Sequence, residues 1–122
     1  MIRKLGLVTA LLGAVALTAC APTSRFEWGA YEQALYAYSQ NPENRGVYKS
    51  ALEKAIERGR ARDAIAPGLL AELGYLYLEE GNSVEALKHF REERALFPES
   101  AVLMDRVINQ LGGSASPTGG QN

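Results

Sequence analysis

Residues 67–100, PGLLAELGYLYLEEGNSVEALKHFREERALFPES, decide the fold. In the first half of this stretch, apolar residues recur at intervals of three and four, which is the spacing of one face of an α-helix. These residues are Leu69, Leu70, Leu73, Leu76 and Tyr77. Gly81-Asn82-Ser83 then interrupts the pattern, and Ser83 can cap a following helix. That helix has Ala86, Leu87 and Phe90 on its inner face and stops at Pro98. The stretch therefore predicts one helix over residues 68–80 and a second that begins at Ser83.

The same 34 residues resemble a tetratricopeptide repeat over its full period. The matching positions are Leu70, Leu73-Gly74, Tyr77, Gly81-Asn82, Ala86, Phe90, Leu96 and Pro98. The resemblance implies that Gly74 lets two antiparallel helices approach and that Ala86 lies where they cross. It also implies that Tyr77 and Phe90 fill the space between the helices. Glu93 stands where the repeat family usually has alanine, so we expect a different contact to the following helix.

Further helices are expected on both sides of this hairpin. Residues 29–38 have the spacing of a repeat's turn and second helix, in the pattern Gly29-x-Tyr31-x-x-Ala34-Leu35-x-x-Tyr38. This spacing places Tyr31 and Tyr38 in the core. Residues 44–59 and 99–111 each have one apolar face, and residues 44–59 do not match the repeat. Since about three repeats are needed for independent stability, these two helices would supply the missing neighbours.

The apolar faces of these two flanking helices are expected to point into the core. The residues concerned are Val47, Tyr48, Ala51, Leu52, Ala55 and Ile56 in the first, and Leu103, Met104, Val107, Ile108 and Leu111 in the second. Gly59 and residues 60–63 are expected to end the first helix and to lead into a loop that closes at Ala66-Pro67-Gly68. The predicted fold is all-α: a short tetratricopeptide-like helical-hairpin domain of about five helices over residues 27–111, after a cleaved signal peptide.

The N-terminus has the pattern of a secretory signal. Residues 1–4 are short and basic, and residues 5–17 form an uncharged run of 13. A membrane-spanning helix needs roughly 20 apolar residues, so this run fits the apolar core of a signal peptide better. Leu17-Thr18-Ala19-Cys20 resembles the lipobox of bacterial lipoproteins. The resemblance implies that residues 1–19 are removed, and that Cys20 carries a diacylglycerol and a further acyl chain.

Two segments outside the helical domain have no apolar pattern of their own. Residues 20–26 are predicted to be the lipidated cysteine and a tether, and residues 112–122 (GGSASPTGGQN) a disordered tail. Two or three acyl chains hold a protein stably on a membrane. Ala21 follows the cysteine, where an aspartate would mark inner-membrane retention. We therefore expect the chain on the periplasmic side of the outer membrane.

The lipobox and several later motifs together resemble one family of short proteobacterial lipoproteins. The motifs are Phe26-x-Trp28-Gly29-x-Tyr31, Pro67-Gly68 before Ala71-Glu72-Leu73-Gly74-Tyr75, and Phe97-Pro98-Glu99-Ser100. The resemblance covers about residues 17–111 and implies no known activity. Members of this family are often encoded beside a lipoprotein that resembles the curli secretion channel, which implies an envelope protein as a partner.

The sequence contains no constellation of residues for catalysis, so we expect no enzyme and no cofactor. His89 is the only histidine and Cys20 the only cysteine, which excludes histidine-based triads, Cys–His pairs and multi-histidine metal sites. His89 is predicted to lie on the surface. Without Arg3 and Lys4, 11 basic residues remain against 14 acidic ones, a net charge of about −3. Such a balance gives no reason to expect a nucleic-acid partner.

Two groups of residues are candidates for a partner contact. Trp28 and Tyr36 fall outside the repeat register, and their amphipathic rings suit either a membrane interface or a protein partner. Arg58, Arg60 and Arg62 are predicted to cluster in a loop, where they are either solvated or available to an acidic partner or to lipid head groups.

Three functions are compatible with these patterns. The first is a non-catalytic adaptor that holds another envelope protein at the outer membrane, because helical repeats present grooves for peptides and helices. The second is an accessory activator of a cell-wall enzyme, and the third is a structural subunit of a secretion assembly. The tether is expected to be short, since six extended residues reach at most about 20 Å.

Overall fold

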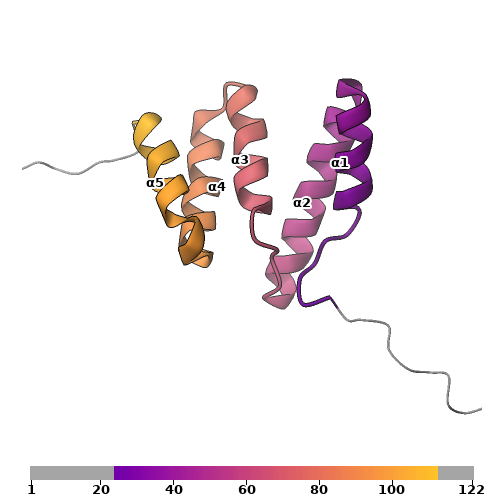
Figure 1. Cartoon of the computed structure of the whole chain (residues 1–122), viewed down its shortest axis with the longest axis horizontal. Coiled ribbons are helices and arrows are strands. Elements are labelled where there is room, and N and C mark those ends of the chain that lie inside the picture. The colour runs from indigo at the N-terminus through magenta and orange to yellow at the C-terminus, as the bar shows by residue number, and fades with distance from the viewer. Residues whose placement is uncertain (1–23, 113–122) are drawn as a thin grey trace, which may run out of the picture.

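The computed structural model describes residues 24–112, which form an all-α domain. Its helices are α1 (Tyr31–Gln40), α2 (Arg45–Arg62), α3 (Leu69–Glu79), α4 (Ser83–Leu96) and α5 (Ala101–Gln110), with two 3₁₀ turns, η1 (Pro42–Asn44) and η2 (Pro98–Ser100). Consecutive helices pack side by side in an antiparallel row with α1 at one end and α5 at the other (Figure 1). The predicted all-α fold of about five helices is confirmed. The predicted signal peptide, Cys20 and residues 113–122 lie outside the described residues.

Two apolar clusters hold the row of helices together. The first lies between α1, α2 and α3 and includes Leu52, Ile56 and Leu70. The second lies between α3, α4 and α5 and includes Phe90 and Met104. Tyr77 of α3 packs against both clusters, so α3 connects the two halves of the domain.

The hairpin of α3 and α4 packs as the repeat pattern predicts. A Cβ atom added to Gly74 would lie only 2.6 Å from Cε1 of Phe90, so only glycine permits this approach of the two helices. Ala86 and Phe90 are both fully buried. The packing roles predicted for Gly74, Ala86 and Phe90 are therefore confirmed.

Replacing Ala86 with leucine is expected to lower the free energy of unfolding by about 1–3 kcal/mol, because three more carbon atoms must fit at a fully packed crossing. Urea unfolding followed by circular dichroism measures the change. Val84→Leu, at a position that is 77% exposed on the same helix, serves as the control and should change stability little. Equal effects of the two substitutions would contradict the packing described for Ala86.

The ends of two helices differ from the sequence prediction. The residue that caps α4 is Asn82, whose side chain accepts a hydrogen bond from the backbone N–H of Glu85 at 3.2 Å. The prediction that Ser83 is the cap is wrong by one residue. Gly81 adopts the left-handed conformation (φ 78°) at the end of the preceding turn, which puts Asn82 in the cap position.

Helix α2 continues three residues beyond its predicted end at Gly59 and stops at Asp63, which is left-handed (φ 52°). Gly59 is buried because the chain folds back over it. A Cβ atom there would lie 2.8 Å from the Cα of Ile65. The glycine therefore marks a close approach of the following loop rather than the end of the helix.

Two residues predicted to face the core are exposed instead. Val47 of α2 is 61% exposed and Leu103 of α5 is 51% exposed. Each lies at the edge of its helix's apolar face, and the neighbouring helix covers only the centre of that face. The prediction for these two side chains is wrong.

The N-terminal segment is attached to the domain from Phe26 onward. The backbone N–H of Glu27 donates to the carbonyl of Ala64 at 2.8 Å, and Glu27 forms an isolated parallel bridge with Ile65. Phe26, which the sequence placed in the tether, packs with Trp28 against the first apolar cluster. No helix within residues 24–112 is long and apolar enough to cross a membrane.

Candidate interaction surface

The aromatic residues of the N-terminal half form one connected cluster. Trp28 lies 5.6 Å from Tyr31, Tyr31 lies 6.3 Å from Tyr48, and Tyr38 stacks on Tyr48 at 5.1 Å, all measured between ring centroids. Trp28, Tyr31 and Tyr38 are half-buried against the first apolar cluster, and Tyr48 is buried within it. Trp28 therefore contributes to packing between α1 and α2. Of the two rings proposed as contacts, Tyr36 is the one left open to solvent, at 69% exposure.

Glu72 of α3 is the polar centre of this cluster. The phenol of Tyr31 donates to Oε1 of Glu72 at 2.7 Å, and the phenol of Tyr48 donates to Oε2. Burial, together with these bonds to a carboxylate, raises the pKa of Tyr31 and of Tyr48 above the usual range. Sequence reasoning missed Glu72. Its position three residues after Leu69 and four before Leu76, on the apolar face of α3, is the signal that could have revealed it.

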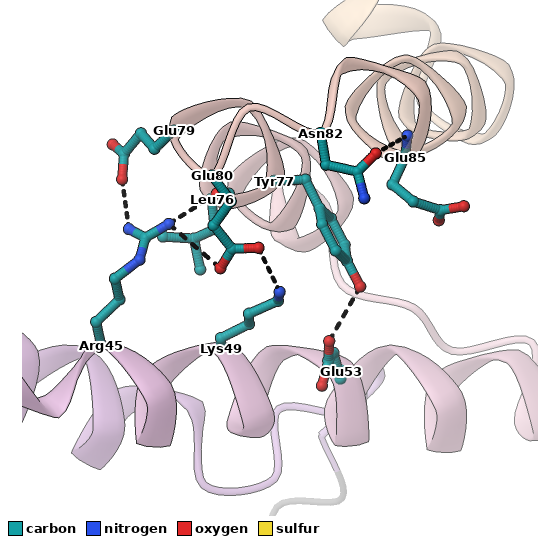
Figure 2. Close-up of polar contacts among 9 residues, drawn as sticks. All are labelled: Arg45, Lys49, Glu53, Leu76, Tyr77, Glu79, Glu80, Asn82 and Glu85. Atoms are coloured by element: carbon teal, nitrogen blue, oxygen red, sulfur yellow. Dashed lines mark hydrogen bonds and ion pairs between the residues drawn. The ribbon is translucent and has the colours of Figure 1, made fainter.

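A row of polar bonds joins α2 to α3 across the surface (Figure 2). Arg45 pairs with Glu79 and also donates to the backbone carbonyl of Leu76 at 2.7 Å. Lys49 pairs with Glu80 at 2.7 Å and lowers the pKa of that carboxyl. These bonds join the first turns of α2 to the last turn of α3, on the side of the row away from the N-terminal segment (Figure 1). They fix the α1–α2 hairpin against the α3–α4 hairpin.

One further hydrogen bond belongs to these polar contacts between α2 and α3. The phenol of Tyr77 donates to Glu53 of α2 at 3.1 Å, with the ammonium of Lys49 over the Tyr77 ring at 4.0 Å from its centroid. Exposed ion pairs contribute little to stability one at a time. Their geometric effect is to set the rotation of one hairpin relative to the other.

The three candidate arginines lie in the last turns of α2, not in a loop as predicted. Arg60 makes two hydrogen bonds to Glu92 of α4, at 3.0 and 2.5 Å, and Arg62 pairs with Glu27 at 2.8 Å. Both therefore tie α2 to other segments of the domain. Arg58 has no ion-pair partner among residues 24–112 and is exposed. Of the three arginines predicted to be available to a partner, Arg58 is the one that no ion pair within the described residues occupies.

A hollow of about 370 Å³ lies beside the point where the chain joins the domain. The apolar walls are Phe26, Ile65, Leu96 and Phe97, and the charged ones are Arg25, Arg60, Asp63 and Glu92. The guanidinium of Arg25 lies over the ring of Phe26, 5.5 Å from its centroid. Since Arg60 and Glu92 neutralise one another, Arg25 is the cation of this hollow that has no ion-pair partner in the described part of the chain.

His89 is buried, so the prediction that it lies on the surface is wrong. Its Nδ1 donates to the carbonyl of Glu85 at 2.7 Å, and its ring stacks on Tyr77 at 5.3 Å between centroids. The histidine lies three residues after Ala86, on the side of α4 that faces α3. It thus contributes to packing between these helices.

Glu93 is the one fully buried carboxylate in the described part of the chain. Its Oε1 accepts hydrogen bonds from the backbone N–H of Gly68 at 2.9 Å and from the hydroxyl of Ser100 at 3.1 Å. It thereby satisfies a donor at the start of α3 and holds η2 against α4. Its Oε2 makes no hydrogen bond within residues 24–112. The altered contact expected at this departure from the repeat pattern is this polar bridge.

The ionisation of Glu93 is expected to make stability depend on pH. Burial raises the pKa of Glu93 above its ordinary value of 4.5 and outweighs the opposing effect of its hydrogen bonds. The folded state therefore favours the protonated form. The resulting stabilisation is complete below pH 4.5 and is lost as the pH rises through the folded-state pKa. Glu93→Gln removes this titration, so wild type should lose stability relative to the variant as the pH rises from about 4 to 8.

Urea unfolding of both chains across this pH range measures the difference. Glu92→Gln, at the neighbouring half-exposed position, is the control for removing a carboxylate from the same helix. A difference between wild type and Glu93→Gln that stays constant with pH would contradict the raised pKa.

The described residues contain no group of three or more histidine, cysteine, aspartate or glutamate side chains placed to hold a metal ion. Neither the curated proteins nor the solved structures include a match to this chain. Residues 26–107 match a family described as a domain of unknown function, DUF4810. This match begins at Phe26, where the chain joins the apolar cluster, and ends at Val107 within α5. It covers all five helices, the last of them in part, and the chain therefore belongs to the DUF4810 family.

Proposed function

We propose that this protein is a lipoprotein, lipidated on Cys20, whose helical domain is a non-catalytic adaptor on the periplasmic side of the outer membrane. The lipobox sequence Leu17-Thr18-Ala19-Cys20 supports the anchor. The resemblance to short proteobacterial lipoproteins supports an envelope protein as the partner, specifically a lipoprotein like the curli secretion channel.

The attachment of residues 26–28 to the helical domain is the observation that carries this proposal. The bridge from Glu27 to Ile65 and the ion pair from Glu27 to Arg62 fix the segment beside the C-terminal end of α2. Phe26 lies only six positions after Cys20, so a lipid on Cys20 would keep this part of the domain within about 20 Å of the bilayer. A partner bound by the domain would be held at the same short distance.

The accessible candidates for the partner contact are Tyr36 of α1 and Arg58 of α2. Tyr36 is 69% exposed, and Arg58 is exposed with its guanidinium next to Gly29. An aromatic ring and an arginine are the side chains that most often dominate binding at protein interfaces. Both come from the α1–α2 hairpin, so this hairpin is the proposed contact element.

Tyr36→Ala and Arg58→Glu are each expected to reduce recovery of the partner at least about fivefold, as loss of a contact residue at an interface does. The measurement is quantitative mass spectrometry of proteins recovered with the tagged full chain from detergent-solubilised envelopes. Val84→Ala on α4, 77% exposed and outside this hairpin, is the control. Identical recovery with all three variants would contradict the proposed contact.

A further inference from the structure

An apolar groove of about 580 Å³ runs along the outer side of the α1–α2 hairpin. Its lining includes Ala34, Ala37, Gly46, Val47, Ala51 and Lys54. On α2, Arg45 and Lys49 point to α3, whereas Val47 and Lys54 lie on the opposite side of the helix. The groove therefore faces away from the rest of the domain, at the end of the helical row that α1 forms (Figure 1).

Lys54 is the charged residue that lines this groove, and further charged side chains lie beyond its two ends. Val47, Ala51, Lys54 and Arg58 follow one another at helical spacing along a single stripe of α2. Lys54 lines the groove, and Arg58 follows it one turn further along α2, with its guanidinium next to Gly29 of the N-terminal segment. Neither side chain has an ion-pair partner within residues 24–112. Glu43 lies in η1, the turn that joins α1 to α2 at the other end of the groove.

The opposite end of the helical row presents a matching helix face. Glu99, Val102, Leu103 and Arg106 form one stripe along the outer side of η2 and α5, at helical spacing. Val102 is 75% exposed and Leu103 is 51% exposed, while Met104, Val107 and Ile108 on the other side are buried. Within the described residues, Glu99 and Arg106 have no ion-pair partner. This stripe thus has an apolar centre with an acid before it and a base after it.

We infer that the α1–α2 groove binds the outer face of α5 from a second copy of this chain. Helices α1 and α5 both begin on the side of the row where the N-terminal segment leaves (Figure 1). Two parallel copies, with their N-terminal segments on the same side, would place Glu99 of one beside Lys54 and Arg58 of the other. Arg106 would then lie toward Glu43, with Val102 and Leu103 in the groove between the charges.

The charges also favour this pairing over a symmetric one. Two copies that met groove to groove, in the same orientation, would set Lys54 and Arg58 against their own counterparts, and like charges oppose association. The charge pairing favours the shared orientation in solution, and anchoring both copies in one membrane would impose it in cells. Only this second point rests on the proposed lipid anchor. A head-to-tail contact between different surfaces leaves a free groove and a free α5 at the two ends, so it extends to short rows of copies.

Cysteine cross-linking between two differently tagged full-length copies tests this contact. Every chain carries Cys20→Ser, so the engineered cysteine is its only thiol and the result does not depend on lipidation. One copy carries Val47→Cys and the other Leu103→Cys, and both are purified in detergent, mixed and oxidised. The control pair combines Val47→Cys with Val84→Cys, a position that is more exposed than Leu103 (77% against 51%) but lies on neither surface. We expect at least about tenfold more cross-linked product from the first pair than from the control.

A charge exchange gives an independent measurement in the same detergent solution. Lys54→Glu should weaken association, measured by analytical ultracentrifugation, and combining it with Glu99→Lys should restore it. Cross-linking no stronger than the control would overturn the inference. So would efficient cross-linking of Val47→Cys copies with one another, because that outcome indicates a symmetric groove-to-groove dimer. Loss of the lipid anchor in cells would leave these results unchanged, so the two proposals fail separately.

Discussion

Phe90→Ala is expected to lower the free energy of unfolding by about 3–5 kcal/mol, the usual range for removing a fully buried phenylalanine. Phe90 has no exposed surface, touches Gly74 of α3 and packs edge-on against Tyr75 at 5.0 Å between ring centroids. Its removal would leave a cavity in the cluster that joins α3, α4 and α5. In a domain of this size, such a loss is a large part of the total stability, which is about 5–15 kcal/mol for most proteins.

The pairing of Phe90 with Gly74 gives this prediction a sharper form. Gly74→Ala alone should destabilise the domain, because the new Cβ would lie 2.6 Å from the Phe90 ring. In a chain that already carries Phe90→Ala, the same methyl group enters the cavity and should have little effect. Urea unfolding of the four chains of this double-mutant cycle gives the coupling energy. Additive effects would mean that the two helices do not meet at these residues.

Cys20→Ser is expected to abolish fatty-acid labelling and to leave the precursor uncleaved, because serine lacks the thiol that accepts diacylglycerol. The chain should then be found as full-length precursor, with residues 1–19 still attached. The measurement is labelling of growing cells with a radioactive fatty acid, followed by gel electrophoresis. Thr23→Ser, three residues further along, is the matched control and should be labelled and processed like wild type. Equal labelling of Cys20→Ser and wild type would contradict the proposed anchor.

The parts of the fold that depend on local spacing could be predicted from the sequence. The hairpin of α3 and α4 follows from apolar periodicity and from a turn with glycine and asparagine. The residue types at Gly74, Ala86 and Phe90 correctly predicted that the two helices pack closely. The end of α2 could not be predicted in this way. Gly59 is required by the loop that folds back to Ile65, a contact that helix propensity does not encode.

The candidate contact surface was predicted less well, because charged residues find partners that are distant in the chain. Arg60 and Arg62 looked available in the sequence but pair with Glu92 and Glu27, more than thirty residues away. His89 was assigned to the surface because of Lys88 beside it, although helical spacing places it next to Ala86 on the inner side.

The polar interface between α2 and α3 could not be foreseen for the same reason. Each of its pairs joins residues more than twenty positions apart, and periodicity within one helix shows only which face is polar. The path of the loop between α2 and α3 decides whether the polar face of α2 meets the polar edge of α3. This loop positions both helices through the buried residues Ala64, Ile65 and Ala66.

Mass spectrometry of the intact protein, extracted from membranes with detergent, measures the proposed anchor itself. We expect a chain that begins at Cys20, lacks residues 1–19, and carries the added mass of a diacylglycerol and one further acyl chain. Cells that express Cys20→Ser should contain only the full-length, unmodified precursor. A mature chain that begins elsewhere, or that begins at Cys20 without added lipid mass, would contradict a lipid-anchored adaptor.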